Sequence, residues 1–312
     1  MFRIIIGWLW FLFAQYAHAA ITLRAELTTG AGHDNALFRL LTELPTLLDE
    51  EDNFWLLSPK FNLGWQFAEK QQLELSYSAS LRQFQQTDNG QALAHNAGIH
   101  YGYTWRNNLQ SYVQLDFLNE KFTALSDNNY AWYGLNTGVY WQPTATWQLS
   151  LAALAQQFQG KIFETKQAGL SLSVDKFLEQ PSFGARIEWL HDASSQERQT
   201  LQVWSTYVFD SFRWSLDAGL SRLENGIWRG VGGEFLWQLH GHWSLVTRYQ
   251  GQWESYDDVQ GLLLGHLVTF KGVYVWPVDP LFKTNQYQTH SHFKHCNKLF
   301  FTFTHHTPRQ SK

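Results

Sequence analysis

Cysteine is nearly absent from this sequence of 312 residues. Because Cys296 is the only one, no disulfide bond can form within the chain. Exported proteins of this size can carry several disulfides, so a fold stapled by them is excluded. No cysteine lies near position 20 either, which excludes a lipid anchor of the bacterial lipoprotein type.

Charged residues and long hydrophobic runs are also scarce. Only 16% of the residues are charged, compared with about 25% in an average soluble domain. The net charge of −4 gives no basic surface for nucleic acid. After residue 20 no stretch approaches the ~18 consecutive apolar residues of a membrane-spanning helix, which excludes a helical membrane protein.

Aromatic residues, in contrast, make up 17% of the chain, with 16 Trp, 13 Tyr and 23 Phe. A domain with one small core cannot bury so many rings. From residue 21 to 276, apolar or aromatic residues alternate with polar ones, over segments that end at Asn, Asp, Gly, Pro or Gln. This period of two is typical of β-strands.

The segment from Gln72 to Gln83 shows the alternation clearly. Its odd positions hold Leu73, Leu75, Tyr77, Ala79 and Leu81, and its even positions hold Glu74, Ser76, Ser78, Ser80 and Arg82. Since successive side chains of a strand point to opposite faces, one face is apolar and the other is polar. The pattern predicts about 14 strands, within a range of about 12 to 16. They lie near residues 20–30, 53–67, 71–85, 92–105, 108–121, 130–142, 145–159, 163–177, 181–193, 197–210, 211–224, 226–239, 242–255 and 262–276.

The first nineteen residues have the composition of a secretory signal peptide. Arg3 supplies the positive charge, an apolar run follows up to Ala14, and residues 17–19, Ala-His-Ala, form a cleavage site. We expect residues 1–19 to be removed, residues 20–276 to form a barrel domain and residues 277–312 to form a tail. An uncleaved anchor is the alternative, but this apolar run is shorter than the ~20 residues of a spanning helix.

The pattern predicts an all-β fold, a single antiparallel transmembrane β-barrel. Every second connection is short and flanked by aromatic residues such as Trp105, Trp141 and Trp147, as at the periplasmic turns of outer-membrane barrels. The alternate connections are longer or more polar and would face the outside of the cell. A secreted β-sandwich is the alternative, but the predicted strands exceed the ~5 to 6 residues typical of soluble strands.

Two segments resemble parts of bacterial outer-membrane barrels. Residues 265–276, GHLVTFKGVYVW, resemble the C-terminal targeting strand of these proteins, although 36 further residues follow here. Residues 30–35, GAGHDN, are similar to the Gly-x-Gly-x-Asp-Asn opening of a group of such barrels, some of which serve lipoprotein or polysaccharide export. The resemblance implies a location in the outer membrane of a Gram-negative cell and insertion by its barrel assembly machinery.

The polar faces of the predicted strands would line the lumen. The charged candidates there are Arg24, Glu74, Arg82, Asp116, Arg186, Glu188, Arg213, Asp217, Glu234, Arg248 and Lys271, together with Glu26 and Asp175. Acidic and basic residues are nearly balanced. Such a lumen would be braced by ion pairs, or would form a narrow polar pathway without strong ion selectivity.

Three other features of the sequence could serve a function. The connection from Gly30 to Asp52 could fold into the lumen or cap it, although an ordinary external loop is the simpler interpretation. A hydrolase could use polar residues of neighbouring strands, namely His95, Asn96, His100 and Ser111, but no spacing demands a catalytic triad. The tail contains metal-ligand types without a strong spacing, namely His290, His292, His295, Cys296, His305 and His306, so we expect neither a metal site nor a cofactor.

Architecture alone does not name an activity. The first hypothesis is a channel for small polar solutes or an export-associated barrel, and not an enzyme. The alternative is a non-conducting structural or assembly barrel that binds a partner through its loops, and the third is an outer-membrane lipid hydrolase. The expected partners are outer-membrane lipid and lipopolysaccharide, the assembly machinery, and a small polar solute or an exported protein.

Overall fold

The computed structural model describes the strands and most of the short connections between them. The described residues are 20–34, 52–85, 90–123, 129–160, 164–177, 181–192, 197–209, 211–223, 226–239, 242–256 and 263–276. The predicted signal peptide, the tail with its histidines, and most of the connection between Gly30 and Asp52 lie outside these residues. Among the described residues, no helix is long and apolar enough to cross a membrane.

Fourteen β-strands make up the described chain, as the alternation predicts. They are β1 (Ala20–Asp34), β2 (Asp52–Ala68), β3 (Gln71–Phe84), β4 (Gln91–Arg106), β5 (Leu109–Phe122), β6 (Tyr130–Thr144), β7 (Trp147–Gly160), β8 (Glu164–Phe177), β9 (Ser182–Asp192), β10 (Glu197–Val208), β11 (Phe212–Leu223), β12 (Gly226–Gln238), β13 (Trp243–Tyr256) and β14 (Leu263–Trp276).

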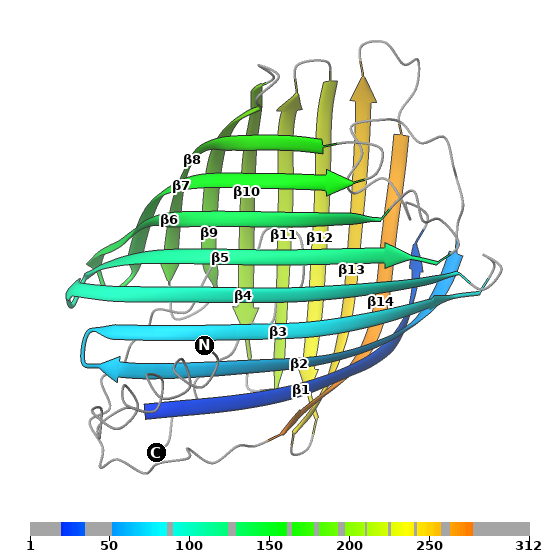
Figure 1. Ribbon diagram of the computed structural model, residues 1–312, viewed down its shortest axis with the longest axis horizontal. Helices are drawn as coiled ribbons and strands as arrows, with labels where there is room; N and C mark the ends of the chain where they lie inside the picture. Colours follow the sequence, from blue (N-terminus) through cyan, green and yellow to red (C-terminus); the bar gives the residue numbers. More distant parts are fainter. Residues whose placement is uncertain are drawn as a thin grey trace, which may run out of the picture. The chain divides into compact units, whose positions relative to one another are not determined.

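The strands form one closed antiparallel barrel in which each strand pairs with its neighbours in sequence, and β1 pairs with β14. The closing pair runs from Ala25 opposite Trp276 to Asp34 opposite Leu267. Figure 1 shows the strands β1 to β8 crossing those of the opposite wall, β9 to β14, as expected where strands tilt strongly against a barrel axis. Closure leaves no unpaired sheet edge, which a bilayer would not tolerate.

The two ends of the barrel differ in their connections. At the end that we call the turn end, each connection between consecutive strands has two to four residues, as between β2 and β3 or between β6 and β7. Turn carbonyls continue the ladder there, since Lys70 O accepts from Thr104 N at 2.8 Å and Asn108 O accepts from Gln142 N at 2.8 Å. At the opposite end, the loop end, 17 residues separate β1 from β2. Short turns are typical of the periplasmic side.

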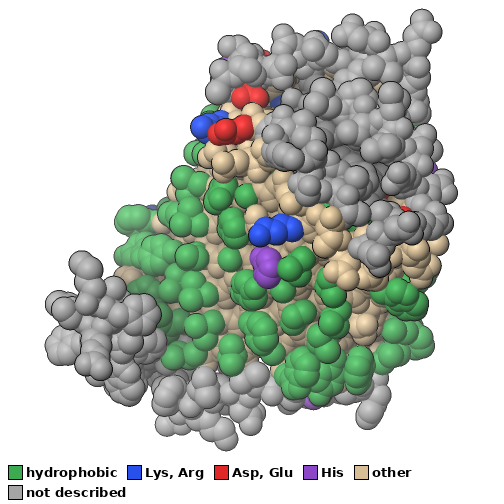
Figure 2. Space-filling model, turned by 45° about the vertical axis from the view of Figure 1, so that its right-hand side comes forward, with side chains coloured by type: hydrophobic (Ala, Val, Ile, Leu, Met, Phe, Trp, Pro, Cys, Tyr) green, Lys and Arg blue, Asp and Glu red, His purple; other side chains and the backbone are tan. Residues whose placement is uncertain are grey.

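The outer face is apolar. Large hydrophobic side chains are exposed along it, with Trp189 of β9 exposed by 46% and Leu216 of β11 by 50%. Figure 2 shows such side chains gathered over the described wall, with few charged ones among them. Aromatic rings cluster at the turn end, where Trp243, Tyr274 and Trp276 contact one another. This belt with an aromatic girdle is the surface that a bilayer covers.

The first strand is longer than predicted. The prediction ended it near Gly30, whereas β1 continues to Asp34. Its last residues pair with β14 on one side and with β2 on the other. Gly32 is suited to this place because the Phe54 ring of β2 lies where a side chain at position 32 would stand.

Candidate lumenal site

The register places charged and polar side chains on the face opposite the apolar belt, and thus in the lumen. In β9, Glu188 is 2% exposed between two belt residues, Ile187 and Trp189, which are 38% and 46% exposed. Following the cross-strand pairs around the barrel puts all eleven candidate residues on this lumenal face. They do not form one cluster but are spread over eight strands.

Ion pairs join several of these residues along one strand or across two. Arg24 and Glu26 of β1 are 2.7 Å apart (Nε to Oε1), and Arg186 and Glu188 of β9 are 2.5 Å apart (Nη2 to Oε1). These pairs are two positions apart, which places both side chains on one face. Arg213 of β11 donates to Glu234 of β12 at 2.8 Å. The Arg213–Glu234 contact braces two neighbouring strands from within the lumen.

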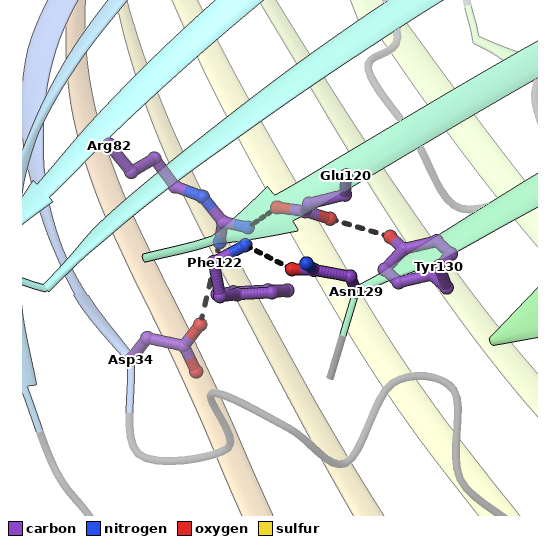
Figure 3. Close-up of polar contacts among 6 residues, drawn as sticks. All are labelled: Asp34, Arg82, Glu120, Phe122, Asn129 and Tyr130. Carbon is purple, nitrogen blue, oxygen red and sulfur yellow. Dashed lines mark hydrogen bonds and ion pairs between the residues drawn. The ribbon is translucent and has the colours of Figure 1, made fainter. Parts of the chain in front are cut away.

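A second network closes part of the loop end (Figure 3). The Arg82 guanidinium of β3 donates to the Glu120 carboxylate of β5, and its other nitrogen lies 3.9 Å from Asp34 of β1. The Tyr130 hydroxyl of β6 donates to the second oxygen of Glu120 at 2.5 Å. Nearby, the backbone NH of Phe122 donates to the Asn129 side chain at 2.6 Å. One arginine thus joins three strands.

Apolar side chains surround this network. The buried lumenal cluster comprises Phe54, Phe84, Ala92, Ala94, Leu118, Phe122 and Tyr130, with Leu56, Trp132 and Leu267 packed against it. The Arg82 guanidinium lies 5.9 Å from the Phe54 ring centroid and 5.8 Å from that of Phe84. At these distances the rings attract the cation. The lumen is therefore filled beside β2 to β6 at the loop end.

A stack of rings fills another part of the lumen, nearer the turn end. His100 of β4, Tyr112 of β5 and Tyr140 of β6 follow one another, with ring centroids 5.7 Å and then 4.5 Å apart. All three are buried, and the Tyr112 hydroxyl donates to Asn136 at 3.1 Å. These side chains lie along the wall of β4 to β6.

Beside the ring stack, the wall of β3 is exposed to water, and Glu74 there stands opposite His100. Glu74 and Ser76 face the lumen but are exposed, unlike Glu120 or Tyr112 on the same side of the barrel. Large side chains elsewhere lie flat on the wall, since the Trp204 ring of β10 occupies the place where a side chain at Gly184 would stand. The described lumen thus has water-accessible polar surface as well as packed regions.

A charged strip runs along β11 to β14. Glu234 of β12 stands directly opposite Arg248 of β13, and Asp217 of β11 acts on Arg248 electrostatically. Lys271 of β14 belongs to the same face and stands opposite Gly30 of β1. Gly30 in turn stands opposite Leu56 of β2, and Leu56 stands opposite Arg82 of β3. Successive cross-strand partners therefore connect the charged strip with the network at the loop end.

The residues considered for a hydrolase do not meet. His95 faces outward and hydrogen-bonds the Tyr77 hydroxyl at 2.8 Å, whereas His100 faces the lumen. Ser111 accepts a hydrogen bond from Trp105 at 3.0 Å. It is aligned with Tyr103, eight positions from His95 along β4, or about 26 Å. No catalytic triad can form from them, and the described residues include no group of three or more metal-ligand side chains.

Sequence reasoning missed several residues of the network at the loop end. Glu120 belongs to the same alternating face as Asp116, and Tyr130 begins the next strand, so the period of two could have indicated both. Asp34 was missed because the first strand was predicted to end at Gly30. No local pattern could have shown that these side chains meet at Arg82, because they come from four strands.

Comparison with known proteins supports the architecture. The sequence matches no protein-family model and no curated protein. The structure is similar to the anion-selective porin from Comamonas acidovorans, with a TM-score of 0.54 and 7% identity over 83% of this chain and 100% of that one. It is also similar to the outer-membrane channel DcaP of Acinetobacter baumannii (TM-score 0.52, 10% identity, 83% and 98% covered). The CymD monoaromatic hydrocarbon channel has a TM-score of 0.51, with 9% identity and 81% and 87% covered. The chain has the fold of bacterial outer-membrane β-barrels, and its apolar belt places it in that membrane.

Proposed function

We propose that this protein is a channel that lets small polar solutes cross the outer membrane. The observation that carries the proposal is the exposed polar surface of the lumen, where Glu74 and Ser76 are open to water inside a closed barrel. A barrel of fourteen strands lies between small barrels filled by side chains and sixteen-stranded porins with open channels. A narrow aqueous route is compatible with that size.

The route would run past the exposed Glu74 and Ser76 of β3 rather than through the filled regions of the lumen. Apolar side chains fill the loop end beside β2 to β6, and stacked rings line β4 to β6 nearer the turn end. The strip on β11 to β14, with Asp217, Arg248 and Lys271, lacks such large buried rings among its described residues. Solutes that pass there would exchange water for charged and polar side chains, which favours polar solutes.

Conductance in planar bilayers tests the proposal. The purified full-length protein should produce discrete, reproducible current steps in potassium chloride. A belt variant with the lumen unchanged, Leu216→Val, should conduct like the wild type. A folded protein that never conducts would contradict the channel and favour the non-conducting barrel that binds a partner. The filled loop end is the feature that supports this second candidate.

An export-associated role and lipid hydrolysis remain hypotheses that separate assays address. Export would require an exported partner, which cross-linking in whole cells would capture. A hydrolase would turn over phospholipid or lipopolysaccharide, and we expect no turnover because the candidate residues lie apart on opposite faces.

Lipid contacts are proposed for the outer face near the loop end. Arg222 of β11 and Arg229 of β12 are exposed there and are diagonal neighbours, since Arg229 stands opposite Leu220. Within the described chain neither makes a hydrogen bond or an ion pair. Arginine binds phosphate through two parallel hydrogen bonds, so the phosphates of lipopolysaccharide are suitable partners. Insertion by the barrel assembly machinery is likewise part of the proposal.

A further inference from the structure

We propose that Arg248, Thr269 and Lys271 form a binding site for a small oxyanion, a carboxylate or a phosphate, on the lumenal wall. This inference rests on the proposed function, because it names the class of solute that the channel would hold in passing. The residues belong to β13 and β14, and Leu267, two positions before Thr269 on the same face, packs against the buried cluster at the loop end.

Antiparallel pairing brings the three side chains together. Arg248 is the partner of Thr269 across the β13–β14 pair, and Lys271 follows Thr269 by two positions on the same face. Opposite side chains on one face of a sheet have Cβ atoms about 4.5 to 5.5 Å apart, and diagonal ones are about 7 to 8 Å apart. A guanidinium, a hydroxyl and an ammonium group therefore border one patch of the wall.

Two of these groups have unused hydrogen-bonding capacity. Thr269 is 4% exposed, and its Oγ1 atom has no hydrogen-bond partner among the residues that the structure describes. Lys271 makes no hydrogen bond or ion pair within that part of the chain, although Arg248, Glu234 and Arg82 act on it electrostatically. An unpaired polar group away from water is costly. An anion that accepts from both groups would remove that cost.

The nearby carboxylates are already engaged. Glu234, which stands opposite Arg248, lies 2.8 Å from Arg213. Asp217 interacts electrostatically with Arg248 itself. Beside these two acidic residues the strip has three basic ones, Arg213, Arg248 and Lys271, and a third acidic position, 254, belongs to the same face of β13 nearer the loop end. Asp34 and Glu120, farther along the wall, both pair with Arg82. The proposed site itself contains two basic residues, Arg248 and Lys271, and no acidic one.

Glycine beside the site leaves room for the stem of Lys271. Gly30 is its partner on β1, and Cγ of Lys271 lies 3.1 Å from the point where a Cβ of residue 30 would stand. The lysine stem thus lies across β1, and its four-carbon chain is flexible. The Thr269 hydroxyl is covered, so an anion would reach it as the lysine turns to meet that anion.

Calorimetric titration of the full-length protein in detergent micelles tests the site. Sodium acetate and sodium phosphate are titrated separately at constant ionic strength. We expect saturable binding to the wild type, and about tenfold weaker binding to Lys271→Gln and to Thr269→Val, because each loses a hydrogen bond to a charged ligand. Lys271→Arg keeps the charge and should retain binding. Lys176→Gln, which removes a lysine held over the outward Trp147 ring, should bind like the wild type.

Conductance of the same proteins separates this inference from the proposed function. Anion binding that depends on Lys271, in a barrel that never conducts, would keep the site and remove the channel. A conducting barrel whose acetate and phosphate affinities are equal in the wild type and in Lys271→Gln would overturn the site and keep the channel. Lys271→Arg and Thr269→Val both preserve the shape of the wall. If Lys271→Gln fails to fold, the comparison of these two variants with the wild type still tests the site.

Discussion

At the scale of single residues, Arg82 is a lumenal charge held by partners from two other strands. It contacts Glu120 and Asp34, and two phenylalanine rings flank it. Its partners have little contact with water, since the Glu120 side chain is 6% exposed. A buried charge is tolerated only where such partners compensate for its lost hydration. Arg82 therefore stabilises the barrel because its removal would leave the buried carboxylates of Asp34 and Glu120 without a cation.

Replacing Arg82 by methionine should destabilise the barrel by about 3 to 5 kcal/mol, because two carboxylates would remain buried without their cation. Urea unfolding followed by tryptophan fluorescence measures the change. The matched control is Lys166→Met, which removes an exposed partner of Glu164 and should leave the unfolding midpoint unchanged. Equal midpoints for Arg82→Met and the wild type would contradict the interpretation of this network as structural.

At the scale of strands, the lipid belt and the lumen impose different demands on neighbouring residues. A strand must also keep its backbone paired on both sides, and Pro59 of β2 is an exception. Its pairing to β1 continues, with Pro59 opposite Leu27, but the pairing of β2 to β3 is interrupted between Leu57 and Lys60. Proline has no backbone NH to donate. The barrel tolerates the gap because the other ladder of β2 is continuous.

The β10 strand offers a direct test of which face meets lipid. Val203 is 45% exposed on the outer face, and the adjacent Gln202 faces the lumen. Val203→Arg should cost about 2 to 4 kcal/mol, because it places a charge in the hydrocarbon layer. Gln202→Arg should cost much less. Folding of both variants into lipid vesicles is measured by urea titration, and equal costs would show that the faces are assigned wrongly.

At the scale of the whole molecule, closure makes the two ends of the described chain adjacent. The β1 strand begins at Ala20 and pairs with β14, which ends at Trp276. The first strand is thus one side of the seam that completes the barrel. The predicted signal peptide precedes it directly.

The mature protein should begin at Ala20 or Ile21. Cleavage there would leave the β1 pairings from Ala25 onward intact. Mass spectrometry of protein isolated from outer membranes checks the N-terminus. Ala17→Leu, which spoils the small-x-small site, should leave the leader attached. A mature protein that retained residues 1–19 would contradict the signal peptide.

The outer arginine pair gives a second prediction at this scale. Arg222→Gln combined with Arg229→Gln should weaken the binding of lipid A vesicles by roughly thirtyfold, at about 1 kcal/mol for each arginine near an anionic lipid surface. Flotation with the vesicles measures the affinity. Dephosphorylated lipid A should bind the wild type and the double variant equally. A difference that persisted without phosphate would show that the pair does not recognise that group.

The period of two in the sequence determined the strands, their number and the face of each lumenal charge. It sufficed because alternation is local, since the direction of a side chain depends only on its position along its own strand. The sequence also showed that one face of each strand is apolar and the other polar, as in the segment from Gln72 to Gln83.

Only the tertiary structure decided which charges meet. Arg82 and Glu120 are 38 positions apart, and the pairing of Arg248 with Thr269 depends on the register of β13 against β14. The continuation of β1 to Asp34 likewise depends on partners in β2 and β14 rather than on its own glycines. Register and closure are non-local, because each is set by the packing of strands against neighbours far along the chain.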